Sequence, residues 1–165
     1  MKRIRNKTMK RNRTRTMLKI AKELVFLEIL MLVIQFVIGM WMNLFATFPT
    51  STYSSTMFGM MGAMFLMPEL IAHMMLGILI LLISLVIFIM LMIEGDYVSS
   101  VLSAIAFISI AVAAIAGMEF VFSGFSNNVF SFMMALGFIF SVMAYFLIFY
   151  LFSNERYPYG VVSKN

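Results

Sequence analysis

Four long apolar stretches dominate the sequence, and each is long enough to cross a lipid bilayer as a helix. A helix advances about 1.5 Å per residue, so about 20 mostly apolar residues span the hydrocarbon core of a membrane. The pattern therefore predicts an all-α integral membrane four-helix bundle. The predicted spans cover residues 24–45, 70–93, 98–122 and 129–152.

The segments outside these spans divide the chain into three parts. A basic arm occupies residues 1–22, the four-span domain residues 23–152, and a polar tail that we expect to be flexible residues 153–165. The loop at residues 46–67, between the first two spans, contains no Asp, Glu, Lys or Arg. We expect its apolar second half to lie on the membrane surface or over the end of the bundle.

Composition supports a membrane protein and removes several kinds of site. The chain is 63% hydrophobic and 12% charged, whereas soluble proteins are typically about half apolar and a quarter charged. It contains no cysteine. This excludes disulfides, thiolate-bound metals, iron–sulfur clusters, c-type haem attachment and cysteine nucleophiles.

Positive charge is concentrated at the start of the chain. Residues 2–22 carry ten of the twelve Lys and Arg residues and no Asp or Glu. Such a cluster attracts phosphates, whether of nucleic acid or of anionic lipid, but next to a first span it also fixes the N-terminus in the cytoplasm. We adopt this second interpretation, without a nucleic-acid partner. It predicts a multi-pass protein of the cell membrane with both termini cytoplasmic.

Polar residues in the first span share one helical face, which we expect to look into the bundle because unpaired polar groups are costly in hydrocarbon. They are Glu28, Gln35, Gly39 and Asn43. Glu28 lies about one turn from the predicted cytoplasmic end. Two interpretations are open: an interface anchor that extends to the surface or pairs with Lys19 or Lys22, and a proton relay.

The second span carries the only histidine of the chain, His73, four residues after Glu69 and on the same face. Gly77 and Ser84 continue this stripe. Near it lie several methionines, and thioethers beside an imidazole are preferred ligands of copper(I). They are Met57, Met60, Met61, Met64, Met67, Met74 and Met75. Plain packing is the alternative interpretation, since methionine fills irregular apolar contacts.

Small residues line one face of each remaining span. In the third span this face predicts close helix packing, and Glu119 lies away from it. Its members are Ala106, Ser109, Ala113 and Gly117. The small or polar side of the fourth span comprises Gly137, Ser141, Ala144 and Tyr145.

Any functional site is expected at the outer end of the bundle, around Glu69 and His73. We expect Asn43, Asn127 and Asn128 at a similar depth. The histidine and carboxylate offer candidate ligands for copper, an axial ligand for haem b, or proton acceptors for a quinol. A packed structural histidine is the alternative. Hydrolase and P-loop motifs are absent from the sequence, which favours a protein that is not an enzyme.

Parts of the sequence resemble known membrane proteins. The runs IQFVIGMWMNLFATFP, LIAHMMLGILILLISLVIFIML and GFSNNVFSFMMALGFIFSVMAYF are similar to small four-helix membrane proteins of archaeal type. The segment from His73 to Gly77 resembles the haem-ligand helices of haem A synthase and cytochrome b-type bundles. This resemblance implies His73 as an axial haem ligand. Those bundles have a second histidine on a later helix, where this chain has Asn127, Asn128 and Ser131.

Two functions follow from these observations, and a third is weighed against them. The first is a non-catalytic accessory subunit that packs against other membrane subunits, or against further copies of itself, in a larger membrane complex, with a respiratory complex as one candidate. The second is a redox protein that holds haem or copper, or contacts a quinol, at His73. A small transporter is a third. Gln35 and Ser84 are the only polar residues in the middle of the first two spans, which argues against a substrate site at the centre of the membrane.

Oxidised and reduced absorption spectra with metal analysis, on protein purified in mild detergent, separate the first two functions. The redox function predicts a Soret band or stoichiometric copper, and His73→Ala should remove it while the protein still folds. A colourless, metal-free preparation that carries other subunits with it would support the accessory role.

Overall fold

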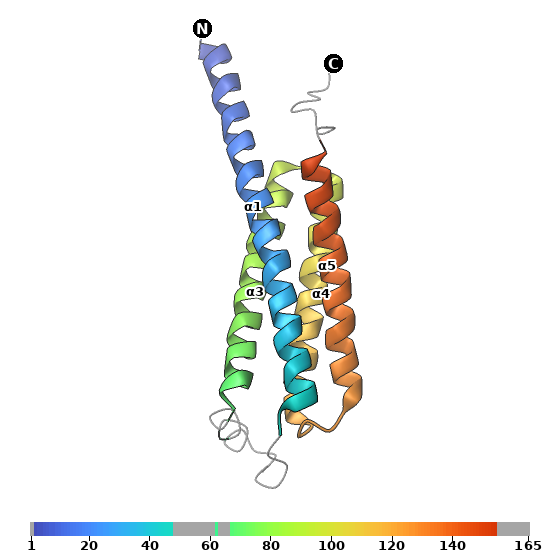
Figure 1. The fold of residues 1–165 in the computed structure, drawn as a ribbon. Helices are drawn as coiled ribbons and strands as arrows, with labels where there is room; N and C mark the ends of the chain where they lie inside the picture. Colours follow the sequence, from blue (N-terminus) through green and yellow to red (C-terminus); the bar gives the residue numbers. More distant parts are fainter. Residues whose placement is uncertain (1, 48–61, 63–66, 155–165) are drawn as a thin grey trace.

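A computed structural model describes the backbone of residues 2–47, 62 and 67–154, and the side chains of these ranges from residue 16 onwards. Four long helices account for almost all of it: α1 (Lys2–Phe45), α3 (Pro68–Glu94), α4 (Tyr97–Phe122) and α5 (Asn128–Ser153). The helices run alternately up and down (Figure 1). In order around the bundle, α1 packs on α3, α3 on α4, α4 on α5, and α5 on α1.

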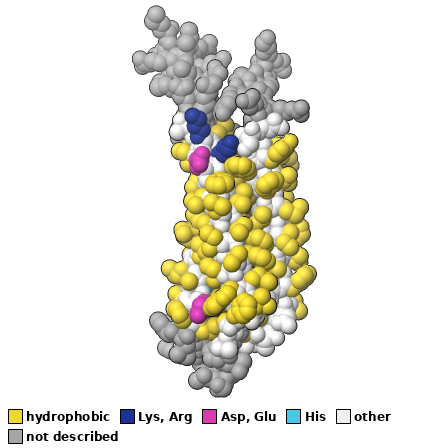
Figure 2. All heavy atoms as spheres, in the orientation of Figure 1, with side chains coloured by type: hydrophobic (Ala, Val, Ile, Leu, Met, Phe, Trp, Pro, Cys, Tyr) yellow, Lys and Arg dark blue, Asp and Glu magenta, His cyan; other side chains and the backbone are white. Residues whose placement is uncertain are grey.

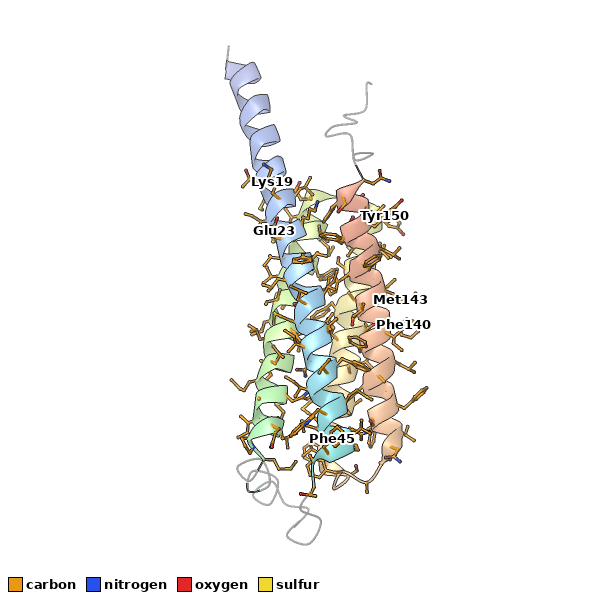
Figure 3. The ribbon with its side chains drawn as sticks, viewed as in Figure 1. Lys19, Glu23, Phe45, Phe140, Met143 and Tyr150 are labelled. Carbon is orange, nitrogen blue, oxygen red and sulfur yellow. The ribbon has the colours of Figure 1, made fainter. Side chains whose placement is uncertain are left out.

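The bundle has two distinct ends. At one end α1 enters and α5 finishes (Figure 1). We call this the basic end because Lys19 of α1 lies there; Glu23 of α1 and Tyr150 of α5 lie at the same end (Figure 3). The opposite end, where Phe45 closes α1, is the far end. The backbone of α1 continues as a helix well beyond the other three helices at the basic end (Figure 1).

All four helices are long and apolar enough to cross a membrane, α1 through its segment Thr16–Phe45. Hydrophobic side chains cover the face shown in Figure 2, where the charged side chains lie near the two ends. Phe140 and Met143, for example, point away from the bundle (Figure 3). The prediction of four membrane-spanning helices is confirmed by length and composition, and this is a polytopic membrane protein.

The helix boundaries follow from local signals in the sequence. Pro68 occupies the first turn of α3, where its missing N–H is not needed. Gly95 ends α3 with a φ of 74°, a conformation that favours glycine. The Asp96 carboxylate then caps α4 by accepting a hydrogen bond from the Ser99 N–H at 2.9 Å. The last three predicted spans match the observed helices within two residues, but the first begins much earlier than predicted.

The closest helix packing joins α4 and α5. A Cβ placed on Gly137 would lie 2.7 Å from the backbone oxygen of Ser109 and 2.8 Å from the Cβ of Ala113. A Cβ on Gly117 would lie 3.3 Å from the Met134 sulfur. The predicted small-residue face of the third span is therefore confirmed as a packing surface, and its partner is the small face of α5.

Aromatic pairs hold the neighbouring helices on either side of this contact. Phe36 of α1 stacks on Phe138 of α5 with ring centroids 4.3 Å apart. Phe88 of α3 stacks on Phe107 of α4 at 6.0 Å. In addition, the Ser100 hydroxyl of α4 donates a hydrogen bond to the Leu91 backbone oxygen of α3 at 3.0 Å. The α1–α5 and α3–α4 pairs are thus also fixed by specific contacts.

We expect Gly137→Ala to destabilise the bundle, because the added methyl group meets backbone and Cβ atoms that cannot rotate away. Overpacking of this kind typically costs about 1–3 kcal/mol. Unfolding in a graded detergent mixture, followed by circular dichroism, measures the change. Gly62→Ala is the matched control, since a Cβ there meets nothing within 4 Å. Equal stability of the two variants would contradict the close α4–α5 packing.

Candidate functional site

Each of α1 and α3 carries one row of buried or half-buried residues spaced alternately by three and four positions, the spacing that is typical of coiled coils. The row on α1 is Ala21, Val25, Glu28, Leu32, Gln35, Gly39 and Met42. The row on α3 is Leu70, His73, Gly77, Ile80, Ser84, Ile87 and Leu91. We call the two facing rows the α1–α3 seam.

Two pairings between a glycine and a polar side chain fix the register of this seam. A Cβ on Gly39 would lie 3.0 Å from Cε1 of His73, and a Cβ on Gly77 would lie 3.1 Å from Nε2 of Gln35. That same Gln35 nitrogen donates a hydrogen bond to the His73 backbone oxygen at 2.9 Å. Since both helices rise about 1.5 Å per residue in opposite directions, this register brings Glu28 level with Ser84.

A third helix contributes to the bundle interior at this level. The Tyr145 hydroxyl of α5 donates a hydrogen bond to the Ser84 hydroxyl of α3 at 2.7 Å. Glu28, Ser84 and Tyr145 are all fully buried, and Glu28 is level with Ser84 in the register set by the two glycine pairings. We call these three residues the polar core. It is contributed by three different helices, so it exists only in the assembled bundle.

The carboxyl group of Glu28 is the exceptional member of the polar core. Its exposed fraction is 0%, and neither of its oxygens has a hydrogen-bond partner among the described residues. Buried polar atoms are nearly always hydrogen-bonded in native proteins. A charged side chain at the centre of a membrane helix costs on the order of 3 kcal/mol. Such a group is therefore a candidate for function rather than a source of stability.

The polar core lies deep in the membrane-spanning region. Ser84 lies about 24 Å from the far-end start of α3 and about 15 Å from its other end, at 1.5 Å per residue. The helix midpoint is therefore only about 5 Å away, well inside a hydrocarbon core about 30 Å thick. The same rise places Tyr145 about 25 Å from the far-end start of α5.

The interpretation of Glu28 as an interface anchor is wrong. Glu28 does not extend to the surface, because it is fully buried, and the Lys22 ammonium lies instead over the Phe149 ring, 5.3 Å from its centroid. The reason is the early start of α1. Ala21 and Val25 are already in the core, so Glu28 is about one turn deeper than a span starting at residue 24 would place it.

The residues expected around an outer-end site are only partly brought together. His73 is half-buried against Gly39, and its Nδ1 atom is buried without a hydrogen-bond partner. Glu69 is half-buried, and Asn43, Asn127 and Asn128 are exposed. Each step of four residues turns a helix about 40° past a full circle. This rotation moves Asn43 and Glu69 off the seam, where Met42 and Leu70 take their places.

The predicted metal ligands can be compared only in part. Met57, Met60, Met61 and Met64 lie outside the described residues. Among the methionines near His73 that are described, Met67 is buried and Met75 is 63% exposed. Within the described ranges, no three His, Asp or Glu side chains are grouped closely enough to hold a metal ion.

The fold and this interior define a class of protein: a polytopic membrane protein built as an antiparallel four-helix bundle with a polar core. No protein-family model, curated protein or solved structure matches the chain. The function must therefore be argued from the residues themselves.

The hydrogen bond between Tyr145 and Ser84 should couple α5 to α3. We expect Tyr145→Phe to lower the unfolding free energy by about 0.5–2 kcal/mol, the range for interhelical hydrogen bonds in membranes. A double-mutant cycle with Ser84→Ala in detergent measures the coupling. Tyr97→Phe is the control, because Tyr97 is 81% exposed. Strictly additive effects of Tyr145→Phe and Ser84→Ala would contradict the coupling.

Proposed function

We propose that this chain is a proton-handling membrane protein in which the carboxyl group of Glu28 takes up and releases a proton inside the bundle. The observation that carries the proposal is the complete burial of this carboxyl group, without a hydrogen-bond partner among the described residues, inside a membrane-spanning helix. Ionisable groups inside membrane spans are rare, and they commonly mark proton or ion pathways.

The surroundings of Glu28 suit a proton rather than a larger ligand. The neighbouring groups of the polar core are two hydroxyls, and these are already joined by a hydrogen bond at 2.7 Å. No Lys or Arg occurs in the sequence between Lys22 and Arg156, so no fixed cation in the spans beyond Lys22 balances a carboxylate. A proton is the smallest positive charge that can do so. Neither hydroxyl is hydrogen-bonded to Glu28 in this structure, although each can donate or accept such a bond.

The accessory role predicted from the sequence is compatible with this proposal. A small bundle that moves a proton without a catalytic set of its own would serve a larger membrane complex, with the basic end facing the cytoplasm. The redox alternative has less support at His73, because the imidazole lies directly against Gly39. A porphyrin between α1 and α3 would require the two helices to separate.

Infrared difference spectroscopy on protein in lipid vesicles tests the proposal. The carbonyl band of a protonated carboxylic acid in an apolar site is distinct from the bands of the backbone. We expect one such band to rise and fall reversibly as the pH is changed, and Glu28→Gln to remove it. A hydrophobic carbodiimide should label Glu28 in the wild-type protein, because this reagent reacts with protonated carboxyl groups in membranes.

Glu23→Gln is the matched control for both measurements. Glu23 lies on the same helix only five residues earlier but is exposed at the basic end (Figure 3). Its replacement should leave the infrared band and the carbodiimide labelling of Glu28 unchanged. If the Glu28 band stays constant over the whole pH range in which the bundle is folded, the carboxyl group does not exchange protons and the proposal fails.

A further inference from the structure

The α1–α3 seam is different on the two sides of the polar core. Towards the basic end, the next two layers are apolar side chains with exposed fractions of 0–1%. They are Val25 with Ile87, and Ala21 with Leu91, paired by the register of the seam. Four such side chains leave no polar atom of the seam between Glu28 and the basic end.

Towards the far end, one apolar layer, Leu32 with Ile80, is followed by polar groups. Beyond it lie Gln35, opposite Gly77, and then His73, opposite Gly39. In both layers a glycine leaves room for the polar side chain on the facing helix. The seam is therefore shaped around Gln35 and His73, although apolar residues would pack at these positions without a polar atom to satisfy.

Two atoms in these layers have unused hydrogen-bonding capacity. Oε1 of Gln35 and Nδ1 of His73 are buried, and neither has a hydrogen-bond partner among the described residues. Buried polar atoms without protein partners are commonly satisfied by ordered water, and water also carries protons between such groups. His73 can hold a proton itself, whereas Gln35 can only orient a neighbour.

We propose that Glu28 exchanges its proton with the far end of the bundle and that His73 relays it. This inference rests on the proposed function of Glu28. In the outward step, the O–H bond of Glu28 breaks, and the proton crosses the Leu32–Ile80 layer to water at Gln35 and then binds a ring nitrogen of His73, which leaves a carboxylate at Glu28. His73 then releases the proton to solvent at the far end. Inward transfer is the reverse.

Few other titratable groups contribute to this route. Beyond Glu28, α1 has no charged residue up to Phe45, and α5 has none at all. The only charged residue of α4 is Glu119, which is exposed near the far end. On α3, Glu69 lies one turn beyond His73 and is half-buried, and Tyr145 of α5 is hydrogen-bonded to Ser84 at the level of Glu28. His73 is therefore the one group between Glu28 and Glu69 that can carry a proton.

A competing route leads to the basic end along α4. Ser99 and Ser103 are fully buried there, and the Ser99 hydroxyl has no hydrogen-bond partner among the described residues. The Ser103 hydroxyl donates to the Ser100 backbone oxygen at 2.9 Å. Neither serine can hold a proton as histidine can. The experiment below therefore uses these two serines as its comparison.

The test follows the infrared band of Glu28 after a pH step on one side of sealed vesicles. The chain has no cysteine, so a membrane-impermeant thiol reagent reports orientation through Ser126→Cys at the far end or Asn154→Cys at the basic end. Both positions are exposed. An entrapped pH dye reports the vesicle interior. When the far end faces the bath, the band should respond before the dye; in the opposite orientation it should follow the dye.

His73→Asn should slow the response of the band at least roughly tenfold, since a positioned proton-transfer group typically contributes a hundredfold or more. Its final amplitude should remain, because Glu28 still binds its proton at equilibrium. The double variant Ser99→Ala with Ser103→Ala should leave the rate unchanged. Should His73→Asn not fold, Gln35→Met removes the neighbouring amide and is expected to slow the response in the same direction.

Other outcomes overturn the inference. A slow response in the serine double variant and a normal one in His73→Asn would place the route at the basic end. Normal rates in every variant would remove His73 from the path while leaving Glu28 as an exchanging group. A band that does not respond to pH in the wild-type protein would instead refute the proposed function itself.

Discussion

The absence of hydrogen-bonding solvent in a bilayer is the constraint on which the rest of this structure depends. Every polar side chain in a span must find its partners inside the bundle. The α1–α3 seam makes room for two such side chains by setting a glycine opposite Gln35 and another opposite His73, and the Gln35 amide donates a hydrogen bond to the His73 backbone oxygen. These two pairings fix the register, and the register in turn brings Glu28 level with Ser84. The position of the buried carboxyl group is thus a consequence of packing two to three turns away from it.

Stability and polarity are divided between the two antiparallel pairs. The α4–α5 pair contains no buried ionisable group apart from Tyr145 and packs backbone against backbone around Gly137. Close packing of small residues is a main source of helix association where lipid is as apolar as the protein. The α1–α3 pair carries Glu28, Gln35 and His73 instead. Tyr145 joins the two pairs, since it extends from α5 to the Ser84 hydroxyl of α3.

Hydropathy was sufficient to predict four spans, because crossing a bilayer sets the length of each apolar run. Hydropathy did not predict the depth of Glu28 correctly. The positive charges of residues 1–22 placed Ala21 in the basic arm outside the bundle, whereas Ala21 of α1 lies in the core. The predicted polar faces also drifted off the true seam at Asn43 and Glu69, because they used steps of four residues throughout. The alternation of three and four, from Ala21 to Met42, was the signal that would have located it. The choice of neighbouring helices depends on tertiary packing, which cannot be predicted from one span alone. The same is true of the hydrogen bond between Tyr145 and Ser84.

The desolvation cost of burying the Glu28 carboxyl group indicates that this residue serves function rather than stability. An apolar side chain of similar volume would remove the desolvation cost of the carboxyl group, and such replacements of buried charged groups are often neutral or stabilising. The two neighbouring layers, Val25 with Ile87 and Leu32 with Ile80, show that this part of the seam accepts apolar pairs readily. Local departures from the packing rules of a fold are expected where a protein works rather than where it is merely held together. Among the fully buried residues described here, Glu28 is the one that departs most from those rules.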